Sequence, residues 1–161
     1  MTRDELCATF VYEPETGMLR RIAGGRKQYP WRPAGKGYLV HTYRSGSIYL
    51  HQAVWLYHHG VVPPMLDHIN GDPNDNRVEN LRPCTNSQNQ LNSCRKVSNR
   101  SGHKGVVFHA NCPGKPWQAK ITVDGRRISL GYYATVEEAG AAYAAGALKH
   151  AGAFARASEI S

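Results

Sequence analysis

Apolar and polar positions alternate in short stretches over the first fifty residues, and segments rich in Gly and Pro separate these stretches. An alternation with period two predicts half-buried β-strands. From His51 to His59 the apolar residues instead recur with helical spacing, and Gly60 follows where such a helix would end. The strands that this pattern predicts are residues 10–12, 18–21, 38–43 and 47–50.

The middle of the chain combines two short apolar steps with a long polar stretch. A strand is predicted to enter Asp67-His68-Ile69, and residues 70–76 are too rich in Asn, Asp, Gly and Pro for a helix or a strand. Residues 80–82 are predicted as a second short strand. A helix then begins after Thr85, because Thr85 and Gln88 have the spacing of a capping box. The middle segment is therefore predicted as strand, polar loop, strand and helix.

The last third of the chain has the clearest pattern. Residues 117–123 alternate between apolar and polar, and Asp124-Gly125 is typical of a type I′ hairpin turn into residues 126–130. A further strand is predicted at residues 105–109. Residues 135–150 begin with a capping box and predict an Ala-rich helix. Three strands and one helix make a small domain.

These elements predict an α+β chain with two folded parts. A β-rich segment (1–64) and the strand–loop–strand–helix core (65–92) form the first part. A polar and basic linker (93–102) leads to the second part (103–155), in which a three-stranded sheet packs against one helix.

The composition of the 161-residue chain is that of a globular protein, with 41% hydrophobic and 20% charged residues. No apolar run approaches the roughly 18 residues that span a membrane, and residues 1–10 lack the apolar core of a signal peptide. The 4 cysteines include no C-x-x-C pair, which argues against a structural zinc site and favours reduced thiols. We therefore expect a cytoplasmic protein without a membrane segment.

The formal net charge of +8 is unevenly distributed along the chain. Residues 1–66 carry 8 basic and 4 acidic side chains, residues 67–94 carry 2 and 4, and residues 95–161 carry 10 and 4. Basic flanks favour a polyanionic partner. Carboxylates between such flanks are expected where a cation is held, although an acidic loop that only faces solvent has the same charge.

The polar middle segment contains the residue types needed to hydrolyse a phosphodiester. The reaction needs a base for water and a cation that neutralises charge on the transition state. The imidazole of His68 is a suitable base near neutral pH, and the oxygens of Asp67 and Asn89 suit Mg²⁺ or Mn²⁺. A simpler interpretation is a local Asp–His hydrogen bond in a turn-forming loop. For His51, packing at the start of a helix and contact with a phosphate are both open.

The middle segment resembles the HNH endonuclease signature, in the variant with Asn at the last position that phage and intron-encoded homing endonucleases carry. The resemblance implies a ββα-metal nuclease module that cuts DNA and leaves 5′-phosphate and 3′-hydroxyl ends. It spans roughly residues 38–92 and rests on Asp67-His68-Ile69-Asn70-Gly71, Asp75–Arg82, Asn86–Asn89 and the upstream segment Tyr49–Trp55.

The resemblance also implies a role for each motif residue. His68 would be the general base, and Asp67 and Asn89 would hold one divalent cation, Mg²⁺ or Mn²⁺, in each active site. Asn80 would be the middle residue that braces the loop. Because Asn stands at the third position in place of His, Asn86 is a rival of Asn89 as the second metal ligand.

Residues 99–155 resemble the plant APETALA/ethylene-response-factor DNA-binding domain, which also occurs fused to HNH nucleases. The matching segments are residues 101–106, 117–121, 130–133 and 135–143. In that family a three-stranded sheet enters the major groove. Val107 and Ser129 stand where the family has further Arg and Trp, which favours phosphate contact over base-specific recognition. The residues expected at the DNA are Lys104, His109, Lys120, Thr122 and Arg127, with Arg77 and Arg82 added from the nuclease segment.

These observations together predict a homing-endonuclease-like, metal-dependent DNA endonuclease with a cutting part and a DNA-binding part. The expected substrate is double-stranded DNA, which a monomer with one active site would nick. The alternative from another class is a non-catalytic, DNA-binding transcriptional regulator whose HNH segment has decayed. A purely structural, Asn-rich interaction module explains the charge distribution poorly.

Overall fold

The computed structural model describes residues 1–22, 30–43, 46–93 and 99–155. Caps and turns set the boundaries of most of its helices and strands. The chain divides into two compact units, Met1–Cys84 and Thr85–Ser161. Residues 94–98 of the predicted linker, which include Cys94, lie outside the described residues. Within the described part, no helix is both long enough and apolar enough to cross a bilayer.

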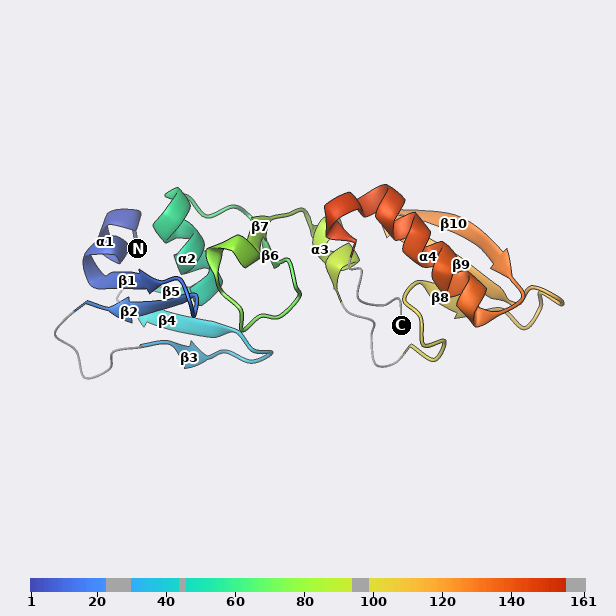
Figure 1. The fold of residues 1–161 in the computed structure, drawn as a ribbon, viewed down its shortest axis with the longest axis horizontal. Coiled ribbons are helices and arrows are strands. Elements are labelled where there is room, and N and C mark those ends of the chain that lie inside the picture. Colours follow the sequence, from blue (N-terminus) through green and yellow to red (C-terminus); the bar gives the residue numbers. More distant parts are fainter. Residues whose placement is uncertain (23–29, 44–45, 94–98, 156–161) are drawn as a thin grey trace. The chain divides into compact units, whose positions relative to one another are not determined.

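The first unit is a mixture of helices and small antiparallel sheets (Figure 1). Its sheets pair β1 with β2, β3 with β4 and β5, and β6 with β7. A 3₁₀ turn, Val78–Asn80, precedes the last strand. The elements in chain order are α1 (Arg3–Thr9), β1 (Phe10–Glu13), β2 (Met18–Arg21), β3 (Arg32–Pro33), β4 (Leu39–Tyr43), β5 (Gly46–Tyr49), α2 (Leu50–His59), β6 (Leu66–His68) and β7 (Leu81–Pro83).

The strands and the helix predicted for this part of the chain are confirmed, and α2 ends on Gly60 in the left-handed conformation. The prediction missed α1. Thr2 and Glu5 form a reciprocal capping box at its start, but Leu6 is its only fully buried side chain. A seven-residue helix with one buried position has no apolar periodicity, so the sequence pattern could not reveal it.

One hydrophobic core holds the first unit together. The indole of Trp31 reaches into it and donates a hydrogen bond to the carbonyl oxygen of Leu19 at 2.7 Å, which satisfies its buried N–H group. This core packs α1, α2, the hairpins and the strand after the polar loop into one body, so the loop is carried by a rigid frame. The buried members are Leu6, Phe10, Leu19, Trp31, Ile48, Leu50, Ala53, Val54, Leu56 and Leu81.

The second unit is a three-stranded sheet in the order β10-β9-β8 with helices beside it. Asp124 and Gly125 both have positive φ angles, 49° and 77°, as a type I′ hairpin requires. The predicted strands, the hairpin and the capped helix are therefore confirmed. The elements are α3 (Asn86–Asn92), β8 (Val106–Phe108), β9 (Trp117–Val123), β10 (Arg126–Tyr133), α4 (Val136–Ala151) and a 3₁₀ turn, Gly152–Phe154.

Helix α4 lies across one face of this sheet at short range (Figure 1). Ala139 is fully buried, and a Cβ atom at Gly146 would lie 2.6 Å from a methyl carbon of Leu130. Small residues therefore allow the close approach of helix and sheet that their spacing predicted.

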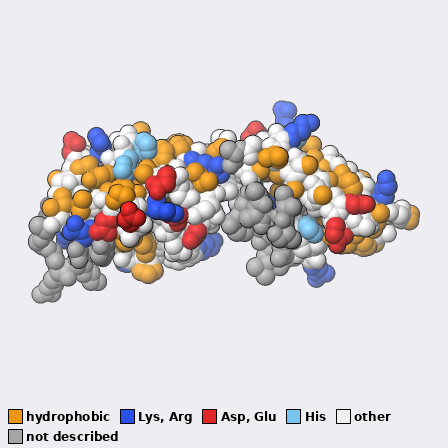
Figure 2. All heavy atoms as spheres, viewed as in Figure 1, with side chains coloured by type: hydrophobic (Ala, Val, Ile, Leu, Met, Phe, Trp, Pro, Cys, Tyr) orange, Lys and Arg blue, Asp and Glu red, His pale blue; other side chains and the backbone are white. Residues whose placement is uncertain are grey.

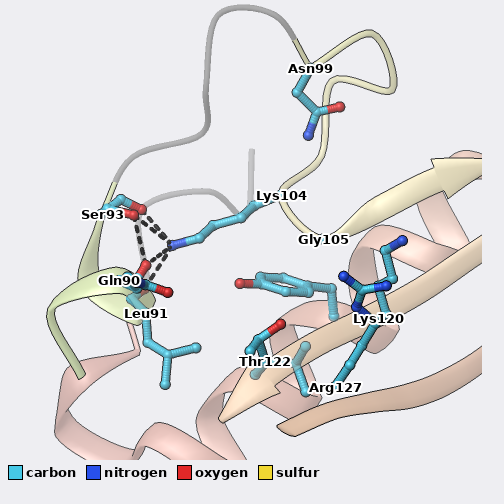
Figure 3. A pocket seen from close by; sticks show the side chains of 11 residues that line it. Gln90, Leu91, Ser93, Asn99, Lys104, Gly105, Lys120, Thr122 and Arg127 are labelled. Atoms are coloured by element: carbon cyan, nitrogen blue, oxygen red, sulfur yellow. Dashed lines mark hydrogen bonds between the residues drawn. The ribbon is translucent and has the colours of Figure 1, made fainter. Parts of the chain in front are cut away.

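Helix α3 packs in the second unit, although its sequence closes the predicted HNH core. The ammonium group of Lys104 donates to the main-chain carbonyl oxygens of Gln90, Leu91 and Ser93 at the end of α3 (Figure 3). A cation at this end is favourable, because the last carbonyl groups of a helix lack partners and carry partial negative charge. The N–H group of Asp124 also donates to the hydroxyl of Ser87 at 2.8 Å.

Candidate active site around His68

The candidate site begins where β6 ends. In the β6–β7 ribbon, Asp67 lies opposite Arg82 and His68 lies opposite Leu81. Successive side chains of a strand point to opposite faces, so Asp67 and His68 have different surroundings. Both are nevertheless nearly inaccessible, with exposed fractions of 5% and 6%.

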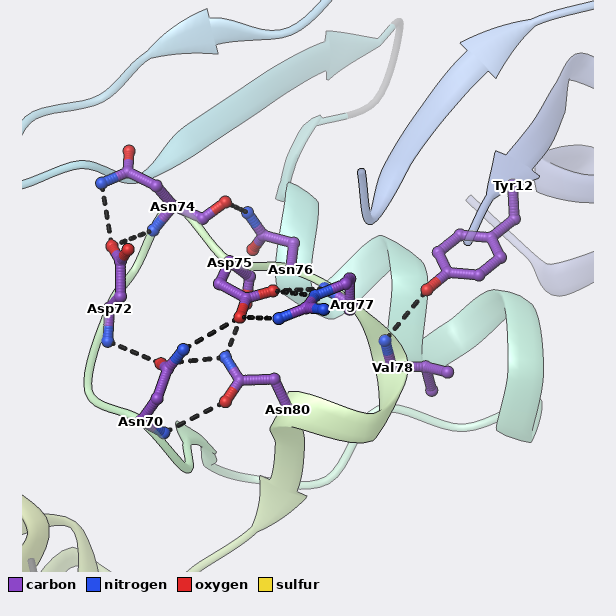
Figure 4. Close-up of polar contacts among 9 residues, drawn as sticks. All are labelled: Tyr12, Asn70, Asp72, Asn74, Asp75, Asn76, Arg77, Val78 and Asn80. Carbon is purple, nitrogen blue, oxygen red and sulfur yellow. Dashed lines mark hydrogen bonds and ion pairs between the residues drawn. The ribbon is translucent and has the colours of Figure 1, made fainter. Parts of the chain in front are cut away.

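Asn80 ties together the two ends of the polar loop between these strands (Figure 4). Its side-chain oxygen accepts a hydrogen bond from the N–H group of Asn70 at 3.0 Å. Its amide nitrogen donates to the side-chain oxygen of Asn70 at 3.1 Å and to the carbonyl oxygen of Asp75 at 2.8 Å. Because this amide is buried and makes three hydrogen bonds, it fixes the loop conformation.

The loop carboxylates bond mainly within the loop. Asp75 accepts from the guanidinium of Arg77 at 2.8 and 2.7 Å and from the amide nitrogen of Asn70 at 2.9 Å. These donors, Arg77 foremost, lower the pKa of Asp75 below its ordinary value. Hydrogen bonds from Asn74 likewise lower the pKa of Asp72. Figure 2 shows acidic and basic side chains interspersed on the visible face of the first unit.

Asn76 holds the imidazole of His68. The side-chain oxygen of Asn76 lies 3.3 Å from Nε2 of His68. The amide nitrogen of Asn76 donates to the carbonyl oxygens of Asn74 and Pro73 at 3.1 and 3.4 Å, so its oxygen must face the histidine. Nε2 then carries the proton and donates, which leaves the lone pair on Nδ1.

The protonation state of His68 suits a base. Burial lowers its pKa below the ordinary value, while the hydrogen bond to Asn76 and the charge of Asp67 act in the opposite direction. The net direction is down, so the imidazole is neutral near pH 7 and its Nδ1 atom can accept a proton.

Two aromatic rings lie close to His68, one from α2 and one from the residue before β4. The ring centroid of His51 lies 5.4 Å from that of His68, and the ring of Tyr38 lies 6.1 Å away. Burial and the neighbouring His68 lower the pKa of His51 to about 4. His51 is therefore uncharged near pH 7 and places no positive charge beside the base. No role for Asn76 was predicted from the sequence, where its position within the motif segment Asp75–Arg82 was the one available sign of such a role.

Asp67 forms an ion pair with Arg82. Nε and Nη2 of Arg82 both donate to the same oxygen, Oδ2 of Asp67, at 3.0 and 2.9 Å. The side chains are only 5% and 14% exposed. The structure thus joins a residue predicted as a metal ligand to one predicted as a DNA contact, and both roles stay predictions.

The remaining predicted ligands lie on α3. Asn89 is half-buried in the middle of this helix, and Asn86 is its first residue. Asp67 belongs to the first unit and both asparagines to the second, so their pairing as ligands stays a prediction. Among the described residues, no group of three or more His, Cys, Asp or Glu side chains is placed to hold a metal ion.

Residues 48–91 match the HNH endonuclease family model. The matched segment begins in β5, ends in α3 and contains Asp67, His68, Asn80 and Asn89. The match supports an HNH nuclease module in this chain.

The chain is also similar to a phage protein over about half of its length. The chain is 30% identical over 79 residues to Protein 3.8 of Escherichia phage T7, a match that covers 48% of this chain and 64% of that protein. The matched region thus spans less than two thirds of the relative's length. No solved structure was found to match the chain.

The residues of the second unit that are predicted to contact DNA lie in two places, on one face of the sheet and at the end of α3. Thr122 pairs with Arg127 and Lys120 pairs with Ser129 across β9 and β10, so these side chains share one face of the sheet. The alternate residues of β9, such as Ile121, pack against the core on the other face. Lys104 instead holds the end of α3, at a cavity of about 600 Å³ that Lys120 and Arg127 also line (Figure 3).

The face of the sheet that carries Lys120, Thr122 and Arg127 is called the open face here. His109 belongs to a row of polar side chains on this face. Its Nε2 atom lies 3.0 Å from the side-chain oxygen of Gln118, and the amide nitrogen of Gln118 lies 3.3 Å from the hydroxyl of Ser129. The ring of Tyr132 lies 5.8 Å from that of His109. The open face thus combines cations with amide and hydroxyl groups.

Proposed function

We propose that this protein is a metal-dependent endonuclease that nicks double-stranded DNA, with chemistry similar to that of homing endonucleases. The observation that carries the proposal is the state of His68. It is buried and neutral, and Asn76 binds its Nε2 atom, so that the lone pair lies on Nδ1. The same histidine lies within the segment that matches the HNH endonuclease family.

In this proposal Nδ1 of His68 takes the proton of the attacking water, and Nε2 keeps its hydrogen bond to Asn76. Asn80 keeps the loop in place through its bonds to Asn70 and Asp75. Asp67 and Asn89, with Asn86 as the rival of Asn89, would hold Mg²⁺ or Mn²⁺, since carboxylate and amide oxygens are the hard ligands such ions bind. The bound ion would neutralise charge that develops on the phosphate.

The test is nicking of supercoiled plasmid DNA by the full-length protein. With Mg²⁺ or Mn²⁺ we expect conversion to the open-circular form, loss of this activity on addition of EDTA, and recovery when the ion is restored. The non-catalytic regulator predicts a different result. If the protein binds DNA and leaves it intact with both ions, the endonuclease proposal is wrong.

We also propose that the open face of the C-terminal sheet binds the DNA backbone, as its resemblance to the APETALA/ethylene-response-factor domain implies. Each phosphate contact releases counterions and contributes about 0.9 to the slope of log K against log salt. Replacing Lys120 or Arg127 with Gln is expected to lower this slope by about 0.9 in a fluorescence-anisotropy titration. The matched control is Lys149→Gln, because Lys149 is exposed in the last turn of α4. An equal loss in the control would contradict the proposal.

A further inference from the structure

The turn between β1 and β2 is in direct contact with the polar loop between β6 and β7. Gly17 is buried in this turn with a φ angle of 66°. A Cβ atom at this position would lie 2.3 Å from the main-chain nitrogen of Arg77 and 2.4 Å from the carbonyl carbon of Asn76. Neither main-chain atom can move aside as a flexible side chain could, so only glycine fits here.

The strand β1 makes a second contact with the same part of the loop. The hydroxyl oxygen of Tyr12 accepts a hydrogen bond from the N–H group of Val78 at 3.0 Å (Figure 4). Val78 begins the 3₁₀ turn, where a main-chain N–H group lacks a partner within the turn. The ring of Tyr12 packs edge-on against His58 of α2, with centroids 4.5 Å apart, which keeps the hydroxyl in place.

The contacts of Gly17 and Tyr12 are made with three consecutive residues, 76–78. The first of these, Asn76, forms the hydrogen bond to His68. Asn76 is 1% exposed, and its side chain binds Nε2 of His68. A shift of its main chain would therefore carry the amide away from the imidazole, since buried side chains have no room to compensate. Tyr12 and Gly17 both lie outside the segment that matches the HNH family.

We propose that the β1–β2 hairpin positions the general base: Gly17 and Tyr12 fix the main chain at residues 76–78, and Asn76 transmits this placement to the imidazole of His68. Gly17 and Tyr12 are positioning residues, because they act through Asn76. The catalytic consequence rests on the proposed nuclease function, whereas the geometric consequence for the ring of His68 does not.

The first experiment compares Gly17→Ala with a matched glycine variant, Gly35→Ala. Gly35 has a φ angle of 86°, and a Cβ atom there would meet no atom within 4 Å. Both variants place alanine in the left-handed region, but only the first presses on the loop. We expect Gly17→Ala to nick DNA at least about tenfold more slowly than Gly35→Ala under single-turnover conditions, because small misplacement of a catalytic group is costly. The Kd for DNA should be the same in both.

The second measurement follows His68 itself, in a long-range ¹H–¹⁵N spectrum of the histidine rings without DNA or metal. The wild type and Gly35→Ala should show His68 protonated on Nε2. Gly17→Ala should shift the ring signals of His68 or mix its tautomers. If the wild-type protein does not nick DNA, the nuclease proposal fails, and this spectrum still tests the positioning.

Tyr12→Phe provides a second variant in case Gly17→Ala does not fold. It removes only the acceptor for the N–H group of Val78, and Tyr43→Phe is its control on a core-packed tyrosine of β4. We expect the same change of the His68 signals in Tyr12→Phe and none in Tyr43→Phe. Folded Gly17→Ala or Tyr12→Phe proteins with wild-type His68 signals would overturn the proposal, whatever their nicking rates.

Discussion

Replacing His68 with alanine is expected to lower the single-turnover rate of DNA nicking by about 10²–10⁴-fold, the usual contribution of a general base. The expected loss is large because the imidazole is neutral, and Asn76 on Nε2 leaves Nδ1 as the proton acceptor. Neither the Kd for DNA nor the metal concentration for half-maximal rate should change much, since the imidazole is assigned to neither task. Quenched-flow or gel-based time courses with enzyme in excess over plasmid measure the rate.

His59→Ala is the matched control for this experiment. His59 is exposed in the last turn of α2, stacks on Trp55 with ring centroids 3.9 Å apart, and has no role in the proposed chemistry. We expect it to nick DNA at the wild-type rate. His68→Gln, which keeps a polar side chain in the buried site, guards against loss of folding. A well-folded His68 variant that cuts as fast as the wild type would show that another residue is the base.

Replacing Arg82 with glutamine is expected to lower the free energy of unfolding by about 3–5 kcal/mol, the cost of breaking a buried ion pair from one side. The substitution leaves the carboxylate of Asp67 without its guanidinium partner, and that carboxylate is only 5% exposed. Urea denaturation of the full-length protein without DNA or metal measures the change.

The second ion pair of the motif gives the control. Arg77 pairs with Asp75 in the same loop, but its side chain is 46% exposed. Arg77→Gln should therefore cost far less stability than Arg82→Gln, because water compensates exposed charges. The double variant Asp67→Asn/Arg82→Gln should recover part of the loss, since it removes both charges together. Equal losses for the two arginines would show that burial does not govern these pairs.

Much of the local structure could be predicted from the sequence. The capping boxes at Thr85 and Thr135 and the turn at Asp124-Gly125 lie where the pattern placed them, because each depends on residues within a few positions. Helix α1 was missed because Leu6 alone of its residues is fully buried, so capping was its only signal.

The candidate site was predictable in its residue types and only partly in its contacts. Asn80 has the bonds of a loop brace, as the motif suggested. The hydrogen bond between Asn76 and His68 was not predicted, because it depends on how the polar loop folds back on β6. For His51, packing and phosphate contact were both open, and its ring lies 5.4 Å from that of His68. Lys104 was expected at DNA, yet in the structure its ammonium group caps α3.

The order of the strands and helices from β4 onward, the basic flanks and the motif that carries Asp67 and His68 follow from the sequence alone. These features depend on residue type and on spacing over a few positions. The pairing of Asp67 with Arg82, the packing of α3 with the C-terminal sheet, and the contact of Gly17 with the main chain of Asn76 became known from the folded structure. Such contacts join residues far apart in the chain, and the close packing of the folded units selects them.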